Sequence, residues 1–135
     1  MLTKHGTLLL LWFTLATTSC PGLKDVSENK RYAATTQINA FCQALEKYYE
    51  ANGRFPNATE SLEVLVKNPE IRQVSEGSSL SHIPLDPWGN KYIYFAECDN
   101  CCPVVMSLGA DGTTGGDGYN ADIESKACPP SLRGN

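Results

Sequence analysis

The segment from Val26 to Ala51, VSENKRYAATTQINAFCQALEKYYEA, decides the fold because it contains no proline or glycine over its whole length. Its apolar side chains recur at intervals of three and four residues, the period that places them on one face of an α-helix. The residues of this face are Ala34, Ile38, Phe41, Cys42, Leu45, Tyr48 and Tyr49. The segment predicts one long amphipathic helix over residues 26–51, ended by Asn52-Gly53, where glycine can adopt a left-handed conformation.

A shorter helix is expected downstream of the long one. Asn57, followed three residues later by Glu60, has the pattern of a helix N-terminus. The helix that starts there should end by Asn68-Pro69. Residues 70–84 show no clear period and are expected to be irregular, with at most a turn of helix from Ile71 to Val74.

The second half of the chain predicts a turn and a hairpin. Asp86-Pro87-Trp88-Gly89 has Asp, Pro and Gly at the first, second and fourth positions of a type I turn. Residues 91–95 and 104–108 are rich in β-branched and aromatic residues, so they predict an antiparallel hairpin over residues 91–108 packed on the long helix. The expected fold class is therefore α+β.

Length, charge and histidine content restrict the class of protein. The chain has 135 residues, which suits one domain, and its 11 Lys+Arg against 15 Asp+Glu give a formal net charge of -4. Without a concentrated basic surface, no nucleic acid is expected as a partner. His82 stands beside Ser79 and Ser81, with no acidic residue closer than Asp86, so neither a catalytic triad nor a zinc hydrolase is expected. The protein is predicted not to be an enzyme.

The N-terminal segment indicates export. The apolar run at residues 8–16 is too short to cross a bilayer, which takes about 20 residues, so residues 1–19 are predicted to be a signal peptide. Ser19-Cys20 resembles the lipobox of bacterial lipoproteins, which predicts lipidation of Cys20; cleavage as an ordinary signal peptide is the alternative. We expect a mature domain over residues 20–135, facing the periplasm and lipid-anchored to the membrane, the outer one because Pro21 gives no retention signal.

Export also changes the interpretation of the cysteines, because an oxidising compartment favours disulfides. The disulfide candidates are Cys42, Cys98, Cys101, Cys102 and Cys128, and their spacing does not fix the connectivity. Cys98 and Cys101 are also spaced as half of a zinc site or as a redox pair, which keeps a thiol oxidoreductase open as a weaker hypothesis.

The segment from Gly109 to Asp122 carries the most informative chemistry. It combines carboxylates, a carboxamide and glycines, and residues 92–125 contain no Lys or Arg. Carboxylates gathered on one loop repel each other unless a cation binds, and oxygen donors of this kind suit Ca²⁺. Residues 111–122 have the length of a twelve-residue EF-hand loop, with glycine at the sixth position and an acidic residue at the twelfth. They do not match at the fifth position, where Gly115 has no side-chain ligand. A calcium loop is favoured over the alternative, a glycine-rich turn with solvated acids.

Several separate blocks, taken together, resemble the major pseudopilin of type II secretion systems, the type II secretion protein G. They are residues 48–56, Asp86 to Tyr92, Ser107 to Gly112, Gly115-Gly116 and Asn120 to Ile123. The resemblance implies a pilin-like domain whose loop over residues 108–122, after the last strand, binds a structural Ca²⁺. The ligands that it implies are the carbonyls of Leu108 and Thr113 and the side chains of Asp111, Asp117 and Asp122, with Asn120 as a further donor.

The N-terminus departs from the family's pattern. Thr7 stands where the family has Phe, Leu11 where it has Glu, and Cys20-Pro21-Gly22 interrupts the apolar helix. The function predicted is that of a non-enzymatic cell-envelope protein of the pseudopilin kind, acting in protein secretion, with other envelope or secretion-system proteins and copies of itself as partners. The alternative is a free-standing, calcium-stabilised lipoprotein module that binds another envelope protein.

Overall fold

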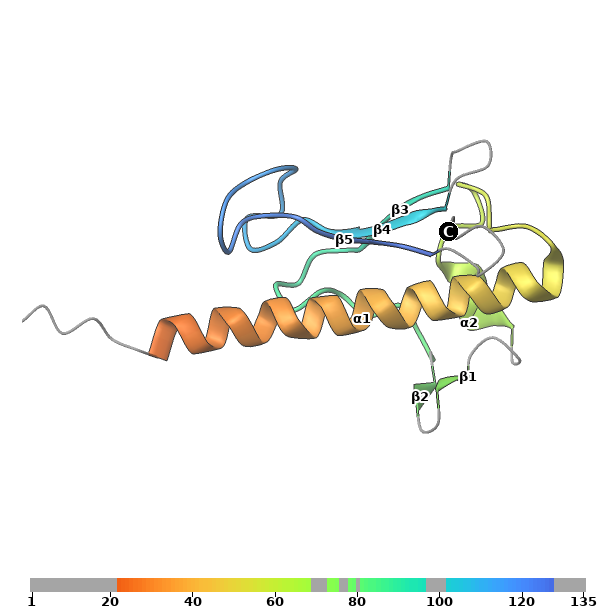
Figure 1. Cartoon of the computed structure of the whole chain (residues 1–135), viewed down its shortest axis with the longest axis horizontal. Coiled ribbons are helices and arrows are strands. Elements are labelled where there is room, and N and C mark those ends of the chain that lie inside the picture. The colour runs from red at the N-terminus through yellow and green to blue at the C-terminus, as the bar shows by residue number, and fades with distance from the viewer. Residues whose placement is uncertain (1–21, 69–72, 76–77, 80, 97–101, 128–135) are drawn as a thin grey trace, which may run out of the picture.

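The computed structural model describes residues 22–68, 73–75, 78–79, 81–96 and 102–127. Helix α1 (Gly22–Asn52) runs along one face of an antiparallel sheet, and the short helix α2 (Glu63–Lys67) packs near the C-terminal end of α1 (Figure 1). The sheet consists of β3 (Ile93–Phe95), β4 (Val104–Ser107) and β5 (Ile123–Lys126), with β4 in the centre. The expected α+β class is confirmed.

The amphipathic period of α1 places the predicted face in the core. Ala34, Ile38, Phe41 and Leu45 are all almost completely buried. The helix begins at Gly22, before the predicted start, and its 31 residues give a length of about 46 Å. It ends where the sequence indicates, because Gly53 has a φ of 69° and its N–H donates to the Tyr49 carbonyl at 2.7 Å.

Helix α2 is shorter than the sequence predicts. The expected capping pattern forms, since the Glu60 N–H donates to Asn57 Oδ1 at 2.8 Å and the Asn57 N–H donates to Glu60 Oε2 at 2.9 Å. The chain nevertheless turns through residues 58–62, and α2 begins only at Glu63. Ser61 has a φ of 50°, outside the right-handed helical region, so a helix starting at Asn57 cannot continue through it.

Strand β5 is absent from the sequence-based expectations. Ile123 is its only β-branched or aromatic residue, so its propensity is weak, yet it pairs with β4 over its whole length, from Ser107 opposite Ile123 to Val104 opposite Lys126. β3 pairs with the other edge of β4, with Tyr94 opposite Val105. The glycine-rich loop therefore connects β4 to β5, and does not follow the last strand as expected.

A small separate hairpin lies within residues 70–84, where no strand was expected. β1 (Gln73–Ser75) and β2 (Ser78–Ser79) pair antiparallel within a stretch that was expected to be irregular. This hairpin projects on the side of α1 away from the three-stranded sheet (Figure 1).

Aromatic side chains at β3 and just before it contact α1 and the segment that follows α1. The rings of Phe41 and Tyr92 meet edge to face with centroids 5.1 Å apart. The Tyr92 hydroxyl donates to Gln37 of α1, and the Tyr94 hydroxyl donates to the Pro56 carbonyl at 2.8 Å. Burial raises the pKa of both tyrosines, so both remain neutral donors at physiological pH.

The carboxylate of Glu60 should titrate at unusually low pH. The Arg54 guanidinium donates to it at 2.7 and 2.9 Å, and this contact, followed by the Asn57 N–H, lowers the pKa of Glu60 from 4.5 to about 2. Because the folded-state pKa is depressed, the stabilisation is complete above pH 4.5 and is lost as the pH falls toward 2. Carbon NMR should show this low midpoint and its upward movement in Arg54→Met. A midpoint near 4.5 in the unaltered protein would contradict the ion pair.

Cys42 is not a disulfide residue, which corrects one of the five candidates. It is a free cysteine, 6% exposed, on the core-facing side of α1, and its side chain is hydrogen-bonded with Ser125 of β5. Cys42 follows the helical period of the core, and a buried cysteine behaves there as a small apolar residue. Cys102 is disulfide-bonded. Cys98, Cys101 and Cys128 lie outside the described residues.

Native Cys42 should resist alkylation. Burial raises the pKa of its thiol, and the thiolate is the reactive form. We expect iodoacetamide at mildly alkaline pH to label Cys42 more than about tenfold more slowly in the native protein than in denaturant, as measured by mass spectrometry of the peptide. Equal rates in both conditions would show that this face of α1 is open to solvent.

Candidate metal centre

A β-turn closed by a hydrogen bond forms at the place where the sequence predicts a turn. The Gly89 N–H donates to the Asp86 carbonyl at 2.9 Å, and Asp86 Oδ1 accepts from the N–H groups of Trp88 and Asn90 at 3.0 and 2.8 Å. The other carboxylate oxygen, Oδ2, accepts from the Ser107 hydroxyl at 2.6 Å. Asp86 is only 4% exposed, and these hydrogen bonds replace the water that its carboxylate loses on burial. The turn is thereby joined to the end of β4.

Backbone contacts hold the two ends of the loop between β4 and β5 together. Gly109 and Gly116 have φ values of 67° and 78°, and a Cβ atom on either would lie 2.7 Å from the Asn120 carbonyl oxygen. Both positions therefore require glycine. The Ala110 N–H also donates to the Tyr119 carbonyl at 3.2 Å. The loop closes tightly around its own backbone.

Two carboxylates of the loop bind backbone N–H groups. Asp111 Oδ1 accepts from Thr113 at 3.1 Å, and Asp122 Oδ2 accepts from Gly115 at 2.9 Å. Asp122 Oδ1, in contrast, is buried without a hydrogen-bond partner. An unsatisfied buried carboxylate oxygen is costly, and a hard cation is a partner that removes this cost. The residues present therefore fit a cation at this loop.

The six predicted calcium ligands lie on one continuous segment of the chain. Leu108 and Asp122 are half-buried, whereas Asp111, Thr113, Asp117 and Asn120 are exposed. Among the residues that the structure describes, no three His, Cys, Asp or Glu side chains are grouped closely enough to hold a metal ion by themselves, so a cation at this loop would also need backbone carbonyl ligands. A calcium site here would combine carboxylates with backbone carbonyls, and Ca²⁺ accepts both kinds of oxygen.

Arg31 connects α1 to the end of the loop. Its Nη1 donates to the Ala121 carbonyl at 2.8 Å, across 90 positions of sequence. Since residues 92–125 contain no Lys or Arg, this contact brings a positive charge to an acidic segment. The sequence pattern places Arg31 on α1 but gives no indication of this partner.

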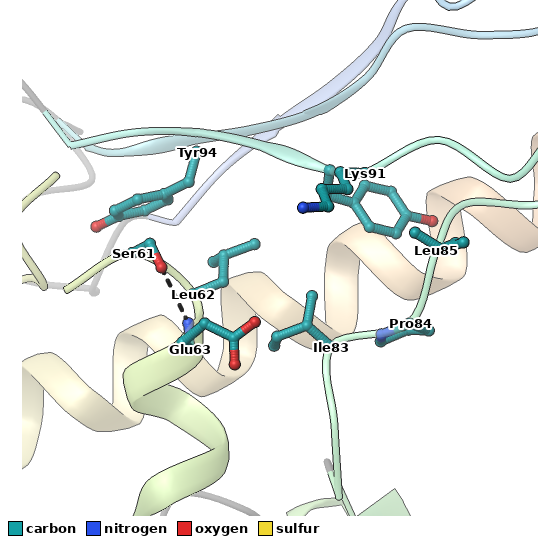
Figure 2. Close-up of a pocket in the computed structure, with 9 residues that line it drawn as sticks. Ser61, Leu62, Glu63, Ile83, Pro84, Leu85, Lys91 and Tyr94 are labelled. Atoms are coloured by element: carbon teal, nitrogen blue, oxygen red, sulfur yellow. Dashed lines mark hydrogen bonds between the residues drawn. The ribbon is translucent and has the colours of Figure 1, made fainter. Parts of the chain in front are cut away.

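A pocket of about 370 Å³ lies next to β3, and no residue of the loop between β4 and β5 lines it. Figure 2 shows its three sides, which come from the start of α2, from Ile83 to Leu85, and from Lys91 and Tyr94. None of the six predicted calcium ligands lines it. The pocket is therefore separate from the candidate metal centre.

His82 is an exposed loop residue. Its Nδ1 lies 3.1 Å from the Ser81 hydroxyl, whereas the carboxylate of Asp86, the acidic residue nearest in sequence, accepts from Ser107 and from N–H groups of its own turn. The three side chains therefore do not form a catalytic triad.

A long helix lying along a small antiparallel sheet, with a glycine-rich loop before the last strand, is the arrangement of a pilin-like protein. The fold is similar to that in the crystal structure of the major pseudopilin from the type 2 secretion system of enterohaemorrhagic Escherichia coli. The TM-score is 0.56 at 24% sequence identity, and the match covers 76% of this chain and 90% of that chain. This likeness establishes the fold.

Sequence comparison identifies the family. Residues 23–126 match the family model described as Type II secretion system (T2SS), protein G. The chain is 40% identical to the type II secretion system core protein G of Vibrio cholerae over 105 residues, which are 76% of this chain and 70% of that protein. It is 38% identical to the Pseudomonas aeruginosa core protein G over 94 residues, 67% of this chain and 66% of that protein. The chain belongs to the type II secretion system protein G family.

The predictions for the N-terminus lie outside the described residues, which begin at Gly22. They concern the signal peptide at residues 1–19 and lipidation of Cys20. None of the helices in the described part of the chain is both long and apolar enough to cross a membrane.

Proposed function

We propose that this protein is a non-enzymatic structural component of a type II secretion system in the cell envelope, and that it assembles with copies of itself and with other secretion proteins. The observation that carries the proposal is the family match over residues 23–126, which spans α1 and the sheet.

Deletion of the gene in its host tests this role. Proteins normally found in the culture medium should remain in the cells, and a plasmid carrying the unaltered gene should restore their release. Unchanged release in a deletion strain without a second protein G gene would instead favour the free-standing lipoprotein module.

A structural calcium ion in the loop is the second part of the proposal. Its ligands would be Leu108 and Thr113 through their carbonyls, and Asp111, Asp117, Asn120 and Asp122 through their side chains. The unpartnered Asp122 Oδ1 and the close backbone packing of the loop support this assignment. When bound, the ion would neutralise the mutual repulsion of the carboxylates and stabilise the fold. Calorimetric titration with calcium chloride tests it directly, and no heat of binding at millimolar concentration would contradict it.

The mode of membrane attachment separates the two candidate functions. The Ser19-Cys20 sequence supports a lipid anchor, and Pro21 supports the outer membrane as its location. The lipid anchor is the observation that favours the free-standing module. Mass spectrometry of the mature N-terminus should find diacylglyceryl on Cys20 if the lipid anchor is correct, whereas methylated Thr7 would indicate a pilin-type leader. An unlipidated chain starting after Ser19 would contradict both anchors.

A further inference from the structure

The peptide group between Leu108 and Gly109 links the candidate metal centre to the turn at Asp86. The N–H of this group, which belongs to Gly109, donates to the Ser107 hydroxyl at 3.3 Å. The same hydroxyl donates to Asp86 Oδ2 at 2.6 Å. The chain of contacts therefore runs from a buried carboxylate, through one hydroxyl, to the first peptide group of the loop.

This peptide group also contains the Leu108 carbonyl. A trans peptide is planar, and its N–H and C=O point in opposite directions, so fixing the N–H fixes the direction of the C=O. The Gly109 carbonyl is held as well, because Asn90 Nδ2 donates to it at 3.4 Å. Asn90 is itself held by Asp86, because the Asp86 N–H donates to the Asn90 carbonyl at 2.8 Å and the Asn90 N–H donates to Asp86 Oδ1 at 2.8 Å.

Both side chains in this series of hydrogen bonds are buried. Ser107 is fully buried and Asp86 is 4% exposed, whereas Asp111 and Asp117 farther along the loop are exposed. We propose that Asp86 and Ser107 are positioning residues, which orient the Leu108 carbonyl as a calcium ligand before the ion binds. This inference rests on the calcium site proposed above. A ligand that is ordered in advance reduces the conformational entropy lost on binding, so the affinity for calcium depends on this contact.

The test compares two serine substitutions on neighbouring strands. Ser107→Ala removes the link between Asp86 and Gly109 and should weaken the calcium affinity, measured by calorimetry, about tenfold. Ser125→Ala on β5 also removes a side-chain hydrogen bond, the one with Cys42, and should leave the calcium affinity unchanged while lowering the melting temperature equally with calcium and with chelator. Unchanged affinity in Ser107→Ala, with the unaltered protein binding calcium, would overturn the positioning role.

Hydrogen exchange of the unaltered protein supplies a measurement that does not depend on whether Ser107→Ala folds. In chelator, the Gly109 N–H should already be protected, and the Thr114 N–H should exchange quickly. If Gly109 becomes protected only when calcium is added, the contact is a consequence of binding and the proposal fails. If the unaltered protein binds no calcium at all, the proposed calcium site fails instead, and the two failures are thereby distinguished.

Discussion

Replacing Phe41 with alanine should lower the free energy of unfolding by about 3–5 kcal/mol, the usual cost of removing a buried aromatic ring. Phe41 is fully buried in the hydrophobic core, and its ring packs edge to face on Tyr92. The loss is a large fraction of the roughly 5–15 kcal/mol by which a typical domain is stabilised. Thermal unfolding followed by circular dichroism should show a decrease in melting temperature of roughly 10–20 °C.

Tyr32→Ala provides the matched control, because it removes an aromatic ring from the same helix. Tyr32 is 76% exposed, so its loss should change the free energy of unfolding by less than about 0.5 kcal/mol. Similar losses of stability in Phe41→Ala and Tyr32→Ala would mean that α1 does not pack on the sheet through the face containing Phe41.

The parts of the fold that the sequence predicts well depend on neighbouring residues. The period of three and four residues identified the buried face of α1, and Gly53 marked its end. The turn at Asp86 was also predictable, since its hydrogen bonds form within five consecutive residues, Asp86 to Asn90. In each case the energetic preference arises within a few residues of the chain.

The features that the sequence did not predict depend on distant partners. β5 has little intrinsic strand propensity and is specified by pairing with β4. The Asp86 carboxylate reaches Ser107 across 21 positions, and the Arg31 guanidinium reaches Ala121 across 90. Such contacts depend on how α1 packs on the sheet, and the pattern of neighbouring residues in the sequence carries no information about that packing. The candidate ligand residues could therefore be identified from sequence, but the residues that support their loop could not.

Calcium should raise the melting temperature of the unaltered protein, and Asp111→Ala and Asp117→Ala should each abolish this rise. A ligand that binds only the native state, at a hundredfold excess over its Kd, adds about 2.7 kcal/mol to the free energy of unfolding. For a domain of this size, that gain raises the melting temperature by roughly 10 °C. Both aspartates are exposed, so neither change should greatly lower the melting temperature in chelator. Glu63→Ala, an exposed acidic residue at the start of α2, should retain the full calcium-dependent rise.

Asp122→Asn distinguishes two effects of this carboxylate: the stability that its burial costs the calcium-free protein, and the stability that calcium binding adds. Asp122 Oδ1 is buried without a hydrogen-bond partner, and burying a neutral amide costs less than burying a charged carboxylate. The melting temperature of Asp122→Asn in chelator should therefore be equal to or higher than that of the unaltered protein, while its rise with calcium is lost. Magnesium should produce a much smaller rise than calcium, because it requires a near-octahedral site that an irregular carbonyl cage does not offer. If chelator and calcium give the same melting curve for the unaltered protein, the segment is a glycine-rich turn with solvated acids.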